Sequence, residues 1–182
     1  MRTAPSPSLT LRTPDRPIVL VGLMGVGKST IGRRLAQRLG LPFVDSDHEI
    51  EAAADLSITE MFTRFGETAF RDGERRVIAR LIDGRPKVIA TGGGAFMNDA
   101  TRALILERAI SVWLDADIDV LADRVARRSG TRPLLNGRDP KQALAELAAI
   151  RNPIYSQAKI HIRSMPQPHN ATVDSILEAL DR

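Results

Sequence analysis

Residues 18–30 read Ile-Val-Leu-Val-Gly-Leu-Met-Gly-Val-Gly-Lys-Ser-Thr, and this stretch decides how the rest of the chain is organised. Within it, Gly22, Gly27, Lys28 and Ser29 complete the pattern G-x-x-x-x-G-K-[ST], which is typical of a phosphate-binding loop. An apolar run of strand type precedes the loop, and residues 31–39 have the spacing of an amphipathic helix. The stretch therefore predicts a strand, a phosphate-binding loop and a helix, in that order.

The residue types of this loop suit a polyphosphate. Gly22, Gly25 and Gly27 let the backbone curl so that consecutive N–H groups point inward. Lys28 adds a positive charge for the β and γ phosphates, and the Ser29 hydroxyl is a potential ligand of Mg²⁺. The alternative is a glycine-rich turn with a solvated lysine, which the flanking strand and helix patterns make the weaker interpretation.

Composition excludes several classes of function. At 182 residues, with 43% hydrophobic and 26% charged residues, the chain is typical of one globular domain. Its longest apolar run, residues 18–27, is too short to cross a bilayer. The 26 basic and 22 acidic residues are dispersed, which does not favour nucleic-acid binding. The absence of cysteine excludes disulfides, thiolate metal sites and cysteine nucleophiles, and is compatible with a cytoplasmic protein.

Strand-like and helical segments alternate along the chain, which predicts an α/β fold of repeated βα units around a parallel sheet. We expect residues 17–182 to form a single domain, and residues 1–16, which lack the apolar core of a signal peptide, to be a disordered leader. Five strands are expected, at residues 18–21, 43–45, 88–91, 111–114 and 159–162.

Two insertions interrupt the alternation. Residues 46–82 predict helices near 46–54, 57–65 and 67–82, with Ser57 as a helix N-cap and Gly66 as a helix stop. Residues 128–139 are rich in arginine and contain Gly, Pro and Asn, which stop helices. Because ligands bind at the carboxyl ends of parallel strands, we expect the first insertion to bind an acceptor and the second to be a lid.

Asp45 stands at the end of the second expected strand, and Asp47 follows it with one residue between them. Phosphoryl transfer needs carboxylates near the phosphates, one for the shell of Mg²⁺ and one to orient or deprotonate the acceptor hydroxyl. The alternative is that Ser46 or Asp47 only caps the next helix. Spacing alone does not separate these interpretations, and the presence of a phosphate-binding loop favours the functional one.

Three further elements are candidates for ligand binding. Arg71 precedes Glu74 by three residues on a helical pattern, and from this stretch alone a surface ion pair is the better interpretation. The glycines at 92–94 follow a strand and permit close approach of backbone to a ligand, although a flexible turn is the alternative. Arg151 lies on the apolar stripe of its helix pattern, where a charge needs an anionic partner or must extend outward.

Arg132 belongs to the expected lid. It is a candidate arginine finger supplied in cis, which would contact the phosphoryl group during transfer. A solvated loop arginine is the alternative, and the residues around it leave both interpretations open.

Taken in order, the motifs resemble those of the shikimate kinases: Gly-Leu-Met-Gly-Val-Gly-Lys-Ser-Thr at 22–30, Asp-Ser-Asp at 45–47, Phe-Arg at 70–71, Thr-Gly-Gly-Gly at 91–94, Arg-Pro-Leu-Leu at 132–135 and Arg-Asn-Pro-Ile-Tyr at 151–155. The resemblance runs from about residue 17 to the C-terminus. It implies a three-layer P-loop kinase fold resembling that of nucleoside monophosphate kinases. It also implies transfer of the γ-phosphoryl group of ATP to the 3-hydroxyl of shikimate, with Mg²⁺, in aromatic amino-acid biosynthesis.

The resemblance assigns roles to particular residues. The implied ATP-binding residues are Gly25, Val26, Gly27, Lys28, Ser29, Thr30, Arg132 and Gln167. The implied shikimate-binding residues are Asp47, Arg71, Gly92, Gly93, Gly94 and Arg151, and this reverses the preference for a surface ion pair at Arg71. Ser29 and Asp45 would hold Mg²⁺, and Lys28, Asp47 and Arg132 would be catalytic. Residues 163–168 depart from the Asp-Thr pattern of the family, and Gln167 would replace the residue that covers the adenine.

The expected partners are therefore ATP and shikimate, bound by a cytoplasmic monomer without nucleic acid or membrane. Two alternatives remain open at this point. One is a kinase of the same fold for another small polyol acid such as gluconate, which the set Asp47, Arg71 and Arg151 makes less favourable. The other is a nucleotide-binding module without transfer activity, against which Asp45, Asp47 and Arg132 argue together.

Overall fold

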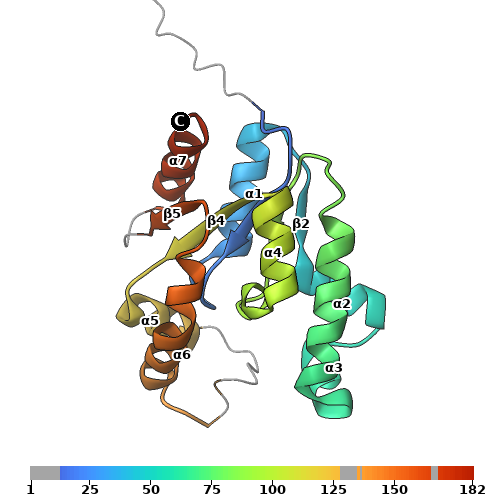
Figure 1. The fold of residues 1–182 in the computed structure, drawn as a ribbon. Helices are drawn as coiled ribbons and strands as arrows, with labels where there is room; N and C mark the ends of the chain where they lie inside the picture. The colour runs from blue at the N-terminus through green and yellow to red at the C-terminus, as the bar shows by residue number, and fades with distance from the viewer. Residues whose placement is uncertain (1–12, 128–134, 136, 165–167) are drawn as a thin grey trace, which may run out of the picture.

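The structure, a computed structural model, describes residues 13–127, 135, 137–164 and 168–182. Five strands form one parallel sheet of order β2-β3-β1-β4-β5 (Figure 1). The strands are β1 (Ile18–Val21), β2 (Phe43–Asp45), β3 (Val88–Ala90), β4 (Ile110–Asp115) and β5 (Ile160–Arg163). The parallel α/β sheet predicted from the sequence is confirmed, and each expected strand end lies within one residue of the observed end.

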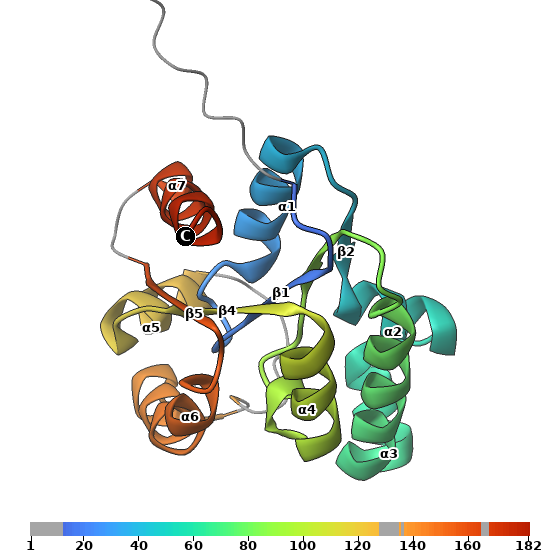
Figure 2. The same ribbon diagram turned by 45° about the horizontal axis from the view of Figure 1, so that its top comes forward.

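Helices cover both faces of the sheet. They are α1 (Lys28–Leu39), α2 (Ser46–Ala54), α3 (Ile58–Leu81), the short 3₁₀ helix η1 (Ala95–Met97), α4 (Asp99–Arg108), α5 (Ile118–Arg127), α6 (Pro140–Tyr155) and α7 (His169–Leu180). Helices α1 and α7 pack together on one face of the sheet, and α4 packs on the other (Figure 2). This arrangement is the three-layer fold expected of a P-loop kinase.

Strand β1 is the centre of the molecule. Its four residues, Ile18–Val21, are all fully buried, because β3 and β4 pair with its two edges and helices cover its two faces. A continuous apolar run is typical of such a doubly covered parallel strand. The chain passes to one side of β1 for β2 and β3 and to the other side for β4 and β5. The loop after β1 therefore lies at the switch point where α/β proteins bind ligands.

Helix α3 joins the two helices that the sequence predicted at 57–65 and 67–82. The break predicted at Gly66 is confirmed, because its φ of 80° and ψ of 173° are not helical and divide α3 into two helical parts that meet at a kink. This region of backbone conformation is accessible almost only to glycine. The predicted N-cap is confirmed, since the Ser57 hydroxyl accepts a hydrogen bond from the Glu60 amide and the Glu60 side chain accepts one from the Ser57 amide.

Several expectations lie outside the described residues. They concern the leader up to residue 12, most of the lid at 128–139, Arg132 and Gln167. Within the described ranges, no helix is long and apolar enough to span a membrane.

Candidate active site

The loop after β1 has the conformation that its sequence predicted. Gly22 adopts a φ of 144°, and a Cβ atom on it would lie 2.3 Å from the carbonyl oxygen of Leu114, so no side chain fits there. The Lys28 ammonium donates hydrogen bonds to the carbonyl oxygens of Gly22 (2.7 Å) and Leu23 (3.0 Å). These contacts hold the lysine across the loop, at the mouth where a phosphate would bind.

Asp45 connects the loop to the second strand. Its Oδ2 accepts a hydrogen bond from the Ser29 hydroxyl at 2.5 Å, and its Oδ1 accepts one from the Asp47 amide at 3.0 Å. Asp45 is therefore the N-cap of α2, and the interpretation that Ser46 or Asp47 caps this helix was wrong. Because the cap is supplied by Asp45, the Asp47 carboxylate lines the neighbouring cavity instead.

The Ser29 hydroxyl and the Asp45 carboxylate are hard oxygen donors, which Mg²⁺ prefers. Among the described residues, no group of three or more His, Cys, Asp and Glu side chains is arranged to hold a metal ion. The two donors fit a Mg²⁺ site in which water and phosphate oxygens supply most ligands, as is usual for Mg²⁺ beside a nucleotide.

Asp47 has the most perturbed carboxylate of the site. Burial, followed by the negative charges of Asp45 and Glu74, raises the pKa of Asp47 to about 6, and the Lys28 ammonium opposes this shift. A carboxylate with a pKa near neutrality accepts a proton more readily than an ordinary one while remaining largely ionised at pH 7. The position of Asp47 therefore suits a general base or an orienting group for a hydroxyl.

Arg71 and Glu74 form a pair on α3, with 2.8 Å between Nη1 and Oε2. The ion pair predicted from the sequence is thus formed, but it lies in the wall of the cavity and not on the outer surface. Glu74 is only 3% exposed, and burial raises its pKa although the Arg71 guanidinium acts in the opposite direction. Its second oxygen, Oε1, is buried without a hydrogen-bond partner among the described residues.

The glycines after β3 lie against the charged side chains of the cavity. A Cβ atom on Gly92 would lie 2.9 Å from Asp47 Oδ1 and 3.0 Å from Glu74 Oε1. A Cβ atom on Gly94 would lie 2.6 Å from the Arg71 guanidinium. Glycine is therefore needed at these two positions for the close packing of charged side chains, since any side chain there would displace a carboxylate or a guanidinium. The approach of this backbone to a ligand stays a prediction.

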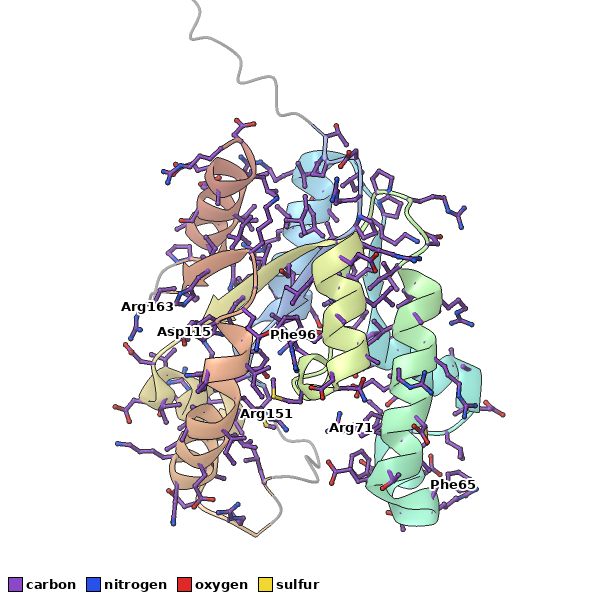
Figure 3. All side chains as sticks on the ribbon, in the orientation of Figure 1. Phe65, Arg71, Phe96, Asp115, Arg151 and Arg163 are labelled. Atoms are coloured by element: carbon purple, nitrogen blue, oxygen red, sulfur yellow. The ribbon has the colours of Figure 1, made fainter. Side chains whose placement is uncertain are left out.

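Arg151 reaches the same cavity from α6. Its neighbours on the helix stripe, Leu144, Ala148 and Tyr155, are buried, and Arg151 itself is only 8% exposed. Its Nη1 is buried without a hydrogen-bond partner in the described part of the chain. Figure 3 shows Arg151 extending from α6 and Arg71 from α3 into the region between these helices. Burial raises the pKa of the nearby Glu74 carboxyl and the Arg151 charge acts to lower it, so this charge is partly compensated. Its unused Nη1 donor predicts an anionic ligand, because a buried polar group without a hydrogen bond is costly.

Together these elements enclose a cavity of about 410 Å³. The residues that line it come from the loop after β1, the strand ends and the helical insertion: Met24, Gly25, Gly27, Lys28, Ser29, Thr30, Asp45, Asp47, Glu51, Ile58, Thr59, Phe62, Phe70, Arg71, Glu74, Thr91, Gly92, Gly93, Gly94 and Arg151. Every described residue of the predicted sites is in this set except Val26, whose side chain is fully buried beneath the loop.

Some cavity residues were not predicted. Glu74 lies on the buried stripe of α3 with Phe70, Val77 and Ile78, and a charge on an apolar stripe was an available signal, as it was for Arg151. Phe62 packs against Phe70 with 4.7 Å between ring centroids, and both rings line the cavity. Nothing in their spacing distinguishes these rings from core residues.

Arg124 was also not predicted to lie near the site. Its Nη1 donates to the carbonyl oxygens of Gly25 and Val26 at 3.4 Å each. The contact joins α5 to the phosphate-binding loop, and only the folded structure brings these distant segments together.

Comparison with known proteins gives one consistent result. The sequence profile of the shikimate kinase family matches residues 24–181. A shikimate kinase of Caulobacter vibrioides is 61% identical over 163 residues, which cover 90% of this chain and 81% of the relative. A shikimate kinase of Zymomonas mobilis is 56% identical over 176 residues, covering 94% of this chain and 99% of the relative.

Solved structures show the same likeness. Shikimate kinase from Acinetobacter baumannii in complex with shikimate superposes with a TM-score of 0.88 and 37% identity, covering 92% of this chain and 94% of that chain. A gluconokinase from Sinorhizobium meliloti superposes with a TM-score of 0.62 and 20% identity, covering 92% of this chain and 93% of that chain. The likeness to the gluconokinase shows a shared fold and does not indicate which acceptor this chain uses.

Proposed function

This chain belongs to the shikimate kinase family, and on that premise we propose that it transfers the γ-phosphoryl group of ATP to the 3-hydroxyl of shikimate, giving shikimate 3-phosphate and ADP. One observation carries the choice of acceptor. The buried guanidinium of Arg151 has an unpartnered Nη1 in a cavity that Arg71 also lines. Two guanidinium groups from different helices suit a carboxylate, which accepts forked hydrogen bonds from each.

The other end of the cavity suits the nucleotide. The amides of the loop from Gly25 to Thr30 and the Lys28 ammonium would bind the phosphates, and the N-terminus of α1 would add its partial positive charge. Val26 would contribute through its backbone alone. Ser29 and Asp45 would hold Mg²⁺, which neutralises charge on the β and γ phosphates when bound.

Asp47 lies between these two ends. We assign it the acceptor hydroxyl, which it would orient and whose proton it would accept as the oxygen attacks the γ phosphorus. The raised pKa of Asp47 supports this role, because the carboxylate is both ionised and basic enough at neutral pH. The backbone at Gly92–Gly94 would touch the acceptor on the side facing Asp47 and Glu74.

Arg132 and Gln167 complete the proposal from outside the described residues. Arg132 would contact the transferring phosphoryl group and stabilise the charge that develops on it, and Gln167 would cover the adenine. The active unit in this proposal is a single chain.

The proposal is tested by measuring ADP release in a coupled assay with MgATP and shikimate. Parallel reactions contain gluconate or no acceptor. ADP release that depends on shikimate supports the reaction and the acceptor together. Release with gluconate alone would keep the kinase assignment and overturn the acceptor, and the absence of any release from protein that binds ATP would indicate a nucleotide-binding module without transfer activity.

A further inference from the structure

The last turn of α6 contacts the glycine turn after β3 through Tyr155. Tyr155 is fully buried, and its hydroxyl donates a hydrogen bond to the carbonyl oxygen of Gly93. Gly93 lines the cavity whereas Tyr155 does not, so the hydroxyl reaches the turn from behind. Burial raises the pKa of Tyr155 to about 12, although the Arg151 guanidinium acts in the opposite direction. The hydroxyl therefore remains a donor throughout the physiological pH range.

The ring of Tyr155 is held by other aromatic residues. The ring of Phe96 in η1 lies 6.3 Å from it and that of Trp113 in β4 lies 6.0 Å from it, measured between centroids. All three residues are at most 6% exposed. Packing on two sides fixes the ring, so the position of the hydroxyl is set by the core and not by the ligand.

The hydrogen bond to Gly93 orients the next amide as well. A peptide group is planar, so the Gly93 carbonyl and the Gly94 N–H point in opposite directions. With the carbonyl held toward Tyr155, the Gly94 N–H is directed away from Tyr155. Among the described residues, the amides of Gly93 and Gly94 donate to no protein acceptor. Two unused donors therefore lie in the glycine turn that lines the cavity, and the Tyr155 hydroxyl sets the direction of the one on Gly94.

Arg151 belongs to the same contact, because it lies one helical turn before Tyr155. A Cβ atom on Gly93 would lie 3.3 Å from Arg151 Nη1, so the guanidinium packs directly on this glycine. We infer that Tyr155 is a positioning residue for the acceptor: its hydroxyl holds the Gly93–Gly94 peptide and the Arg151 guanidinium as one unit around the acceptor's anionic group. The inference rests on the proposed function, since it takes that anionic group to be the carboxylate of shikimate.

The test is the variant Tyr155→Phe, which removes the hydroxyl and keeps the ring. We expect the KM for shikimate to rise about three- to tenfold, as for the loss of one buried hydrogen bond, with the KM for ATP changed less than about twofold. The matched control is Ser111→Ala, because the Ser111 hydroxyl is also buried and accepts a hydrogen bond from the Lys159 amide at 2.8 Å, away from the cavity. The control is expected to lower Tm and to leave both KM values unchanged.

A double-mutant cycle with Arg151→Lys gives a second measurement. Since Tyr155 and Arg151 act through the same glycine, their effects on shikimate affinity are expected to be non-additive by about threefold or more. An unchanged KM for shikimate in Tyr155→Phe, equal changes in both KM values, or strict additivity in the cycle would each overturn the inference while the proposed function stands. A wild-type protein that neither binds nor phosphorylates shikimate would overturn both.

Discussion

Among the described residues, the Arg71 guanidinium forms ion pairs with two carboxylates, which differ in exposure. Its Nη1 pairs with Glu74 inside the cavity wall, and its Nη2 lies 3.6 Å from Glu67, which is mostly exposed. The pair with Glu74 is the stronger, because this carboxylate is buried and Arg71 is its only hydrogen-bond partner among the described residues, although the Arg151 guanidinium also acts on it. Glu74 thus orients the guanidinium, while the carboxylate of the acceptor would complete its hydrogen bonding.

Replacing Arg71 with alanine is expected to raise the KM for shikimate by about 10- to 100-fold, as for the loss of charged hydrogen bonds. The KM for ATP should change little, because the phosphate-binding loop lies at the other end of the cavity. Steady-state kinetics with each substrate varied in turn measures both. Arg75→Ala is the control, since Arg75 is exposed on the same helix. Equal losses for the two substrates would contradict the assignment.

The pKa of Asp47 predicts how activity depends on pH. Burial and neighbouring carboxylates raise this pKa from 3.8 to about 6, so protonation removes the base as the pH falls through 6. We therefore expect kcat/KM for shikimate to be level above about pH 7 and to fall about tenfold per pH unit below about pH 5. In Asp47→Asn, activity should drop by about 10²- to 10⁴-fold. A wild-type profile that stays level to pH 4.5 would exclude Asp47 as the titrating group.

Helix α3 places Arg71 and Glu74, and its shape depends on a single glycine. Gly66 kinks the helix, whereas Gly73 lies within its regular second part. A Cβ atom on either glycine would meet nothing within 4 Å, so packing does not distinguish them. The backbone conformation distinguishes the two glycines, because Gly66 has a φ of 80° whereas Gly73 has no positive φ.

Alanine substitutions at these glycines are expected to have opposite effects on stability. Gly66→Ala should lower the free energy of unfolding by about 1–3 kcal/mol, since alanine is strained in this conformation. Gly73→Ala should raise it by about 0.4–1 kcal/mol, because alanine loses less backbone entropy on folding. Urea titration followed by circular dichroism measures both. If both variants are destabilised equally, the difference in backbone conformation is not what decides their stability.

At the scale of the whole molecule, the sequence predicted the sheet because each strand is a short apolar run between turn signals, and Ile18–Val21 is the clearest case. Some site residues were predicted because a side chain did not fit its local pattern, as with the charged Arg151 on an apolar helix stripe. Others were predicted because several motifs together resembled a family. The carboxylate pair was predicted, but the alternative that Ser46 or Asp47 caps the helix left out Asp45, because all three are good capping residues.

Other features depend on contacts between distant segments, which no local pattern contains. The hydrogen bond from Tyr155 to Gly93 joins residues 62 positions apart, and Arg124 contacts a loop 98 to 99 positions away. Tyr155 stood in a recognised motif, yet its hydroxyl had no assigned partner until the fold placed α6 against the glycine turn. The helix break predicted at Gly66 is present, but the sequence did not predict the angle between the two parts, because glycine signals a break without specifying its geometry.

We expect Arg151 to lower the stability of the whole molecule without ligand and to favour the binding of shikimate. Its guanidinium is buried and only partly compensated by Glu74, and its Nη1 has no hydrogen-bond partner in the described part of the chain, so this unused donor disfavours folding until a ligand binds. Replacement by methionine, which is apolar and of similar length, is expected to leave the free energy of unfolding unchanged or to raise it by about 1 kcal/mol. Shikimate at about 100 times its Kd should stabilise the wild type by about 2.7 kcal/mol.

Thermal unfolding with and without ligand tests both the stability of Arg151→Met and the stabilisation by shikimate. The wild type should gain about 5–10 °C in Tm with shikimate, and Arg151→Met should gain almost nothing. MgADP is the control ligand, because its phosphates would bind at Lys28, and it should stabilise both proteins equally. A variant that is strongly destabilised without ligand would show that Arg151 supports the fold itself, and a variant that keeps the full shikimate shift would show that the acceptor does not use this guanidinium.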